Sequence, residues 1–163
     1  METIIITRHG DYDPNTGSLD DDGIAGVNKL ADAIKTYVTR PVAIIASPIL
    51  RATETAELIA SLLPGVVEVI ECDALADGAE VSGTDCNELI DAAVANAGEE
   101  IATVVLVTHD QVAHNYVNHY LYRAFGVEHP RHFQIGYAEA VVVSARDGEI
   151  RVIARGSRTI SPG

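Results

Sequence analysis

Short apolar runs recur along the chain and are separated by longer segments of mixed character. Three of these runs are continuous: TIIIT (3–7), VAIIA (42–46) and TVVLVT (103–108). Continuous runs of this length are typical of strands that are buried on both faces of a parallel sheet. The segment GVVEVI (65–70) is expected to form a further strand.

Helices are expected between these strands, because apolar residues there recur every three or four positions and form one buried face per segment. The four expected faces are Val27, Leu30, Ala31, Ile34 and Val38; Ala52, Ala56, Ile59, Ala60 and Leu63; Leu89, Ile90, Ala93, Val94 and Ala97; and Ala113, Tyr116, Val117, Tyr120 and Leu121.

Polar residues predict where these helices begin. Ser47 suits the N-cap of the second helix, with Pro48 at the first helical position. Thr84 is the expected cap of the third helix. Thr108 and Gln111 have capping-box spacing, which predicts that the fourth helix starts there.

The C-terminal segment 139–156 has the pattern of an antiparallel hairpin, with a turn at Arg146-Asp147-Gly148. The alternation of strands and helices before it indicates an α/β protein. We therefore expect a three-layer α/β/α sandwich whose mostly parallel sheet carries the hairpin at one edge. The 163 residues fit one domain, 1–163.

Polar side chains stand where three predicted parallel strands end. Arg8 and His9 follow the first strand, Arg51 lies in the first turn of the helix after the second, and His109 follows the strand at 103–108. Ligands of such sheets bind beyond the carboxyl ends of the strands. These four side chains are therefore expected to form a compact cationic pocket at one edge of the sheet.

Arg51 is the most informative of the four, because the first turn of a helix carries partial positive charge and disfavours a cation. Its compensating anion is either Glu54, three residues later, or an external ligand. Arginine donates bidentate hydrogen bonds to phosphate oxygens, and Gly10 would let the backbone approach a ligand closely. Phosphate is the anion that these residues fit best.

The net charge of −13, with only 11 basic residues, argues against a general binder of nucleic acid or anionic membranes. The first residues lack the features of a signal peptide, and no apolar run approaches the roughly 20 residues of a membrane span. A cytoplasmic location is expected, with Cys72 and Cys86 reduced, although their number permits one disulfide. The sequence indicates no oligomeric state.

Three motifs in this order resemble the histidine phosphatase superfamily, also called phosphoglycerate-mutase-like. They are RHG (8–10), SPILRATETA (47–56) and VVLVTHD (104–110). The resemblance covers residues 3 to about 121, and the short chain is similar to the compact branch that includes bacterial phosphohistidine phosphatases. It implies a phosphoglycerate-mutase-like fold and a phosphatase that needs no metal or other cofactor.

The resemblance also implies roles for matching positions. His9 matches the nucleophile that becomes phosphohistidine, and Arg8, Arg51 and His109 match the residues that hold the phosphoryl group. Asn15 falls where some members carry a phosphate-contacting asparagine. The implied partner is a phosphorylated small molecule or a phosphoprotein.

Many members supply a Glu or Asp general acid from the segment before the late histidine, and here no motif marks it. The loop 72–85 offers Asp73, Asp77, Glu80 and Asp85. Asp77 is preferred as the acid, followed by Glu80; the alternative is that these are solvated loop carboxylates.

Three further carboxylates lie beside the expected pocket. Asp110 would either cap the helix or modulate the pKa of His109, and it adds negative charge near the anion site. Asp11 and Asp13 are either solvated loop residues or part of substrate selection.

Two other functions fit these motifs: a non-catalytic protein that binds phosphate or a phosphoprotein, and a phosphoglycerate-type mutase, for which the chain is short. A metal site is not expected in HDQVAHNYVNHY (109–120), because histidines five residues apart do not share a helix face. Arg131 and His132 could line the mouth of the pocket.

Overall fold

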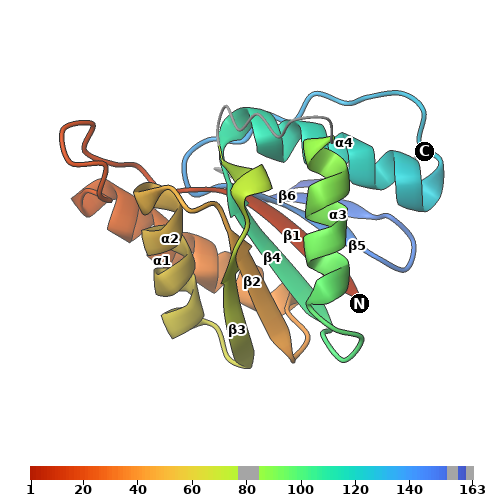
Figure 1. Cartoon of the computed structure of the whole chain (residues 1–163), viewed down its shortest axis with the longest axis horizontal. Helices are drawn as coiled ribbons and strands as arrows, with labels where there is room; N and C mark the ends of the chain where they lie inside the picture. The colour runs from red at the N-terminus through yellow and green to blue at the C-terminus, as the bar shows by residue number, and fades with distance from the viewer. Residues whose placement is uncertain (77–84, 154–157, 161–163) are drawn as a thin grey trace.

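A seven-stranded sheet lies between layers of helices (Figure 1). The computed structural model describes residues 1–76, 85–153 and 158–160. The strand order is β3-β2-β4-β1-β5-β6-β7, with the bounds β1 Thr3–Arg8, β2 Val42–Ala46, β3 Val66–Glu71, β4 Thr103–Thr108, β5 Ala140–Ser144, β6 Ile150–Ile153 and β7 Arg158–Ile160. The first four strands pair in parallel, whereas β5, β6 and β7 are antiparallel.

Two helices pack on each face of the sheet, which confirms the predicted α/β sandwich (Figure 1). Ile4 belongs to the core under α3 and α4, and its neighbour Ile5 belongs to the core under α1 and α2. Successive side chains of a strand point to opposite faces, so a strand covered on both sides needs a continuous apolar run. The helices are α1 Asp21–Ile34, α2 Leu50–Leu62, α3 Cys86–Asn96 and α4 Asp110–Phe125.

The predicted start of α2 is wrong. Ile49 is its N-cap and Leu50 its first residue, so Ser47 and Pro48 stay outside the helix. The Ser47 hydroxyl instead lies 2.9 Å from the Nε2 atom of His109, on another strand end. The Ser47 side chain, which local spacing assigned to a helix cap, is therefore engaged in a contact with a residue that is distant in the sequence.

The other two predicted caps also differ from the structure. The Thr108 hydroxyl donates to the carbonyl of Leu75, and α4 has no side-chain cap, so no capping box forms with Gln111. Asp85 is the N-cap of α3; the predicted cap, Thr84, lies outside the described residues.

The predicted hairpin is confirmed as β5 and β6, and β7 extends the sheet beyond it.

α1 ends at Ile34 and a 3₁₀ turn follows at Lys35–Tyr37, so Val38 is extended and not part of the helical face. Cys72 and Cys86 form no disulfide bond within the described residues. Within the described part of the chain, none of the helices has the length and apolar character needed to cross a membrane.

Candidate active site

The register of the parallel strands brings three strand ends to one edge of the sheet. β1 and β4 are paired up to their last residues, Arg8 and Thr108, and β2 ends beside the same part of β4. The N–H of His9 donates to the carbonyl of Thr108 over 3.0 Å, which continues the ladder one residue further. The residues that follow the three strands, His9, Ser47 and His109, therefore meet.

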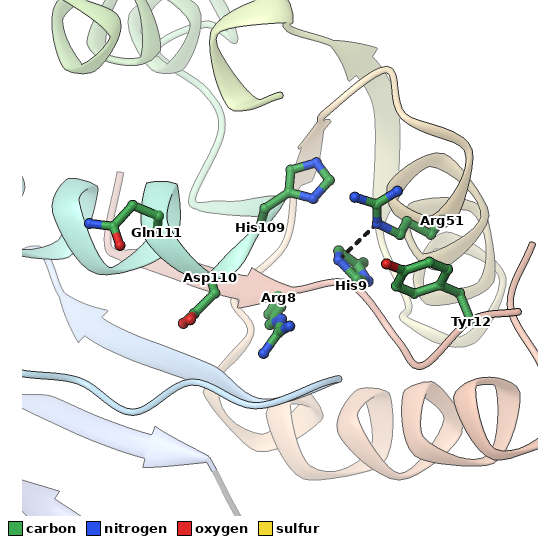
Figure 2. Close-up of a pocket in the computed structure, with 7 residues that line it drawn as sticks. All are labelled: Arg8, His9, Tyr12, Arg51, His109, Asp110 and Gln111. Carbon is green, nitrogen blue, oxygen red and sulfur yellow. Dashed lines mark hydrogen bonds between the residues drawn. The ribbon is translucent and has the colours of Figure 1, made fainter. Parts of the chain in front are cut away.

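A cavity of about 260 Å³ opens at this edge (Figure 2). Four of its lining residues are the predicted cationic set, which the fold brings together from three separate parts of the chain. The lining consists of Arg8, His9, Tyr12, Arg51, His109, Asp110 and Gln111.

His9 is only 3% exposed, and both of its ring nitrogens have defined neighbours. The Nδ1 atom lies 2.8 Å from the carbonyl oxygen of Gly10. A carbonyl oxygen can only accept, so Nδ1 carries the proton and Nε2 carries the lone pair. The Nε atom of Arg51 donates to this Nε2 over 3.2 Å. The lone pair of His9 is thus directed at the guanidinium group.

Arg51 lies at the second position of α2, where the helix dipole disfavours a cation. Of the two anions considered for it, Glu54 is used elsewhere: its carboxylate accepts from the hydroxyl of Ser18 and from the N–H of Leu19. Arg51 instead lies over the ring of Tyr12, with its Cζ atom 4.5 Å from the ring centroid. Its guanidinium therefore stays available to an external anion.

Arg8 is held from the opposite side of the pocket. Its Nη1 atom donates to the carbonyl of Ile135 over 3.4 Å, and its Cζ atom lies 4.1 Å from the ring centroid of Tyr137. Among the described residues, none accepts a hydrogen bond from its buried Nε. Stacking and one carbonyl contact fix the orientation of the guanidinium while leaving donors for a ligand.

His109 is almost fully buried, and its ring lies edge-to-face with that of His9 at 5.0 Å between centroids. The Ser47 hydroxyl accepts from the N–H of Ile49 over 3.2 Å and contacts Nε2 of His109. The hydroxyl thereby links the α2 start to the His109 ring and sets its orientation.

The structure shows a packing role for Gly10, and its expected role near a ligand stays a prediction. A Cβ there would lie 2.9 Å from the Val27 side chain and 3.0 Å from the carbonyl of Gly23, so its small size serves the packing of β1 against α1. Its N–H donates to the Thr55 hydroxyl, which in turn donates to the carbonyl of Arg51. Thr55 therefore connects the backbone beside His9 to the helix that carries Arg51.

The remaining predicted phosphate contact lies apart from the cavity. Asn15 is exposed on the loop before α1, where its N–H donates to the Asp13 carboxylate, and it is not among the lining residues. The carboxylate of Asp11, like that of Asp13, accepts a hydrogen bond from a backbone N–H of the same loop, in this case that of Tyr12. Asp110 lines the pocket as the first residue of α4.

The predicted general acids, Asp77 and Glu80, lie outside the described residues. Of the other two carboxylates considered in that loop, Asp73 begins a 3₁₀ turn and Asp85 caps α3 through the N–H of Asn87.

The other polar residues of the late segment also lie away from the cavity. His119 contacts the Asp91 carboxylate at 2.6 Å, and His114 packs against His132 with ring centroids 5.1 Å apart. Neither His132 nor Arg131 lines the pocket. Within the residues that the structure describes, no group of three or more His, Cys, Asp and Glu side chains is arranged to hold a metal ion.

Sequence reasoning missed the aromatic residues of the site. Tyr12 lies three residues after His9 and lines the pocket, and Tyr137 packs on Arg8 from the loop before β5. Proximity to the RHG motif could have indicated Tyr12. Tyr137 had no local signal, because it reaches the site only through the pairing of β1 with β5.

Residues 4–88 match the histidine phosphatase superfamily (branch 1). This match spans more than half of the chain, so the protein belongs to that superfamily, and the resemblance of its motifs is confirmed. Membership supports the expected class of enzyme, a phosphatase. A sequence search of the curated proteins finds no match.

Solved structures with the same fold include several phosphatases. The protein histidine phosphatase SixA complexed with tungstate is 21% identical, with a TM-score of 0.64 and coverage of 98% of this chain and 97% of that one. The mycobacterial glucosyl-3-phosphoglycerate phosphatase in complex with VO3 is 17% identical (TM-score 0.64; coverage 94% and 98%). A phosphoserine phosphatase mutant from Entamoeba histolytica, in complex with phosphoserine, is 18% identical (TM-score 0.57; coverage 94% and 96%).

Proposed function

We propose that this protein hydrolyses a phosphomonoester or phosphohistidine through a phosphohistidine intermediate on His9. The observation that carries the proposal is the state of the His9 ring. Its Nδ1–H is held by the Gly10 carbonyl, and its Nε2 lone pair faces the pocket beside Arg51. A neutral imidazole with one nitrogen anchored and the other directed at a cationic site is an oriented nucleophile.

In the first step, the Nε2 lone pair of His9 forms a bond to phosphorus, and the bond from phosphorus to the leaving group breaks. The leaving group departs with that electron pair and takes up a proton. In the second step, water attacks phosphorus, the bond from phosphorus to Nε2 breaks, and the water gives up a proton. Inorganic phosphate leaves, and His9 regains its lone pair.

Arg8, Arg51 and His109 would bind the phosphoryl oxygens. Phosphoryl transfer depends mainly on positioning and on stabilising the charge that spreads over the equatorial oxygens. The two guanidinium groups supply fixed positive charge, so we expect hydrolysis that does not depend on a metal ion.

The substrate is proposed to be a phosphorylated small molecule or a phosphoprotein. Solved structures of the same fold include proteins described as acting on phosphohistidine and glucosyl-3-phosphoglycerate, and one holds phosphoserine. An imidazole leaving group has little need of a dedicated acid, whereas an alkoxide does. For alkyl phosphates, Asp77 and then Glu80 are the proposed acids.

The test is hydrolysis of p-nitrophenyl phosphate and of a phosphohistidine peptide, each with and without EDTA. We expect turnover by the wild type in EDTA, its loss in His9→Ala, and its retention in His129→Ala, which removes an exposed histidine. Acid-labile phosphate on the wild-type protein after rapid quenching would support the intermediate. Activity that survives in His9→Ala, or vanadate binding without turnover of either substrate, would contradict the proposal.

A further inference from the structure

We propose that Tyr12 is a further phosphoryl-binding residue, whose hydroxyl donates a hydrogen bond to an oxygen of the phosphoryl group on or near His9. This inference rests on the proposed function, because it concerns the same pocket. Tyr12 lines the cavity, with its ring centroid 5.4 Å from that of His9 and the two ring planes 74° apart. Figure 2 shows its hydroxyl end pointing toward His9 and the guanidinium of Arg51.

The ring of Tyr12 is held in this position from several sides. The guanidinium of Arg51 lies over one face, and the Tyr137 ring lies edge-on at 6.2 Å between centroids. Its backbone forms a β-bridge with Leu19, and the N–H of Leu19 donates to the carboxylate of Glu54 on α2. Glu54 therefore ties the loop that carries Tyr12 to the helix that carries Arg51, so the two side chains are positioned together.

The hydroxyl of Tyr12 is able to donate a hydrogen bond to a ligand. Within the described residues it makes no hydrogen bond, although a tyrosine hydroxyl in a partly buried site usually has a partner. The Tyr12 ring lies beside Arg51 and His9, and the Nε2 lone pair of His9 already accepts from Arg51. A bound phosphoryl group would bring acceptor oxygens to this place, and a neutral donor can serve them without adding charge.

The second tyrosine beside His9 provides a natural comparison. Tyr137 lies 5.6 Å from His9 between ring centroids and packs on Arg8, just as Tyr12 packs on Arg51. Tyr137, however, is 43% exposed and does not line the cavity. The two residues thus share the stacking role, and the inference assigns phosphoryl binding to Tyr12 alone.

The experiment compares Tyr12→Phe with Tyr137→Phe, since each keeps its ring against its arginine and loses only a hydroxyl. Orthovanadate serves as the oxyanion probe, and its dissociation constant is measured for both variants and the wild type. Loss of one hydrogen bond to a charged oxygen should weaken vanadate binding roughly tenfold in Tyr12→Phe. Tyr137→Phe should weaken vanadate binding by a smaller factor than Tyr12→Phe, and Tyr122→Phe, which removes an exposed phenol away from the cavity, should bind vanadate as the wild type does. The kcat/KM for p-nitrophenyl phosphate and for an alkyl phosphate should fall by similar factors in Tyr12→Phe.

Unchanged vanadate affinity in Tyr12→Phe, or equal losses in the two variants, would overturn the inference. A loss confined to the alkyl phosphate, with normal vanadate binding, would also overturn it, because the hydroxyl would then act on the leaving group. Thermal unfolding of each variant verifies that the fold is intact. Failure of the proposed function is a separate result: it would appear as absence of turnover in the wild type, while the vanadate comparison would still test Tyr12.

Discussion

The Nε atom of Arg51 donates to the Nε2 atom of His9 over 3.2 Å, although the two residues are 42 positions apart in the sequence. This contact joins the proposed nucleophile directly to a proposed phosphate-binding cation. An incoming phosphoryl group would occupy the space that faces both groups, so that Arg51 exchanges the nitrogen lone pair for phosphoryl oxygens. The proposed nucleophile and a proposed phosphoryl-binding group therefore lie side by side before any substrate binds.

Arg51→Lys tests whether the shape of this cation matters. Lysine keeps the charge but loses the planar donor set and the stacking on Tyr12. We expect kcat/KM for p-nitrophenyl phosphate to fall about 100-fold or more, equivalent to ~3 kcal/mol of transition-state stabilisation. Arg146→Lys, at an exposed ion pair with Glu2, is the control and should keep wild-type kinetics. Near-normal activity in Arg51→Lys would mean that charge alone is sufficient.

Thr55→Val tests the link between the backbone beside His9 and α2. Thr55 is fully buried and accepts from the N–H of Gly10, so the isosteric change leaves that N–H without its acceptor. The free energy of unfolding should decrease by about 1–3 kcal/mol, as measured by urea denaturation. In Thr53→Val, on the exposed side of the same helix, only a local bond to the Leu50 carbonyl is lost, and the decrease should be much smaller.

Gly23→Ala should disrupt the loop that carries Tyr12. A Cβ at this position in α1 would overlap the backbone carbonyl of Asp11, so the loop after RHG must move. We expect destabilisation of ~1–3 kcal/mol together with reduced kcat/KM. The matched control is Gly26→Ala in the same helix, where a Cβ would lie 3.4 Å from the nearest side chain. That change should stabilise the protein by about 0.5–1 kcal/mol through helix propensity, and the opposite ranking would contradict the steric account.

The raised pKa of the Tyr116 phenol implies that the free energy of unfolding changes at alkaline pH. Burial raises its pKa well above the ordinary value, and the neighbouring Asp91 carboxylate, which accepts its hydrogen bond at 2.9 Å, raises it further. Above about pH 10 the unfolded tyrosine ionises while the folded one stays neutral. The unfolding free energy should therefore fall with rising pH, by up to about 1.4 kcal/mol per pH unit for this group.

Urea denaturation between pH 8 and 11 measures this dependence. Tyr116→Phe should show a shallower decline above pH 10 than the wild type, whereas Tyr122→Phe removes a phenol from the exposed surface and serves as the control. The partly buried Tyr120, whose pKa burial also raises, would account for part of the decline that remains in Tyr116→Phe. Identical slopes in Tyr116→Phe and the wild type would show that Tyr116 does not contribute.

Local sequence patterns predicted the bounds of strands well where burial alone determines which residues a strand contains. The runs at 42–46 and 103–108 correspond residue for residue to β2 and β4, because a strand covered on both faces must be apolar throughout. Helix starts were less predictable. Ser47 and Thr108 have side chains that suit caps, yet His109 and the Leu75 carbonyl compete for their hydroxyls. These competing partners are distant in sequence, so no local spacing reveals them.

The sequence by itself determined which four polar residues would meet, because Arg8, His9, Arg51 and His109 each lie at or shortly after the carboxyl end of a parallel strand. Only the tertiary structure decided what surrounds them. Pairing of β1 with β5 brings Tyr137 onto Arg8, and the bond network of Glu54 holds the Tyr12 loop beside Arg51. The positions of the strands along the chain follow from hydrophobic patterning, which is local, whereas side-chain stacking and hydrogen-bond competition depend on contacts between segments that meet only in the folded chain.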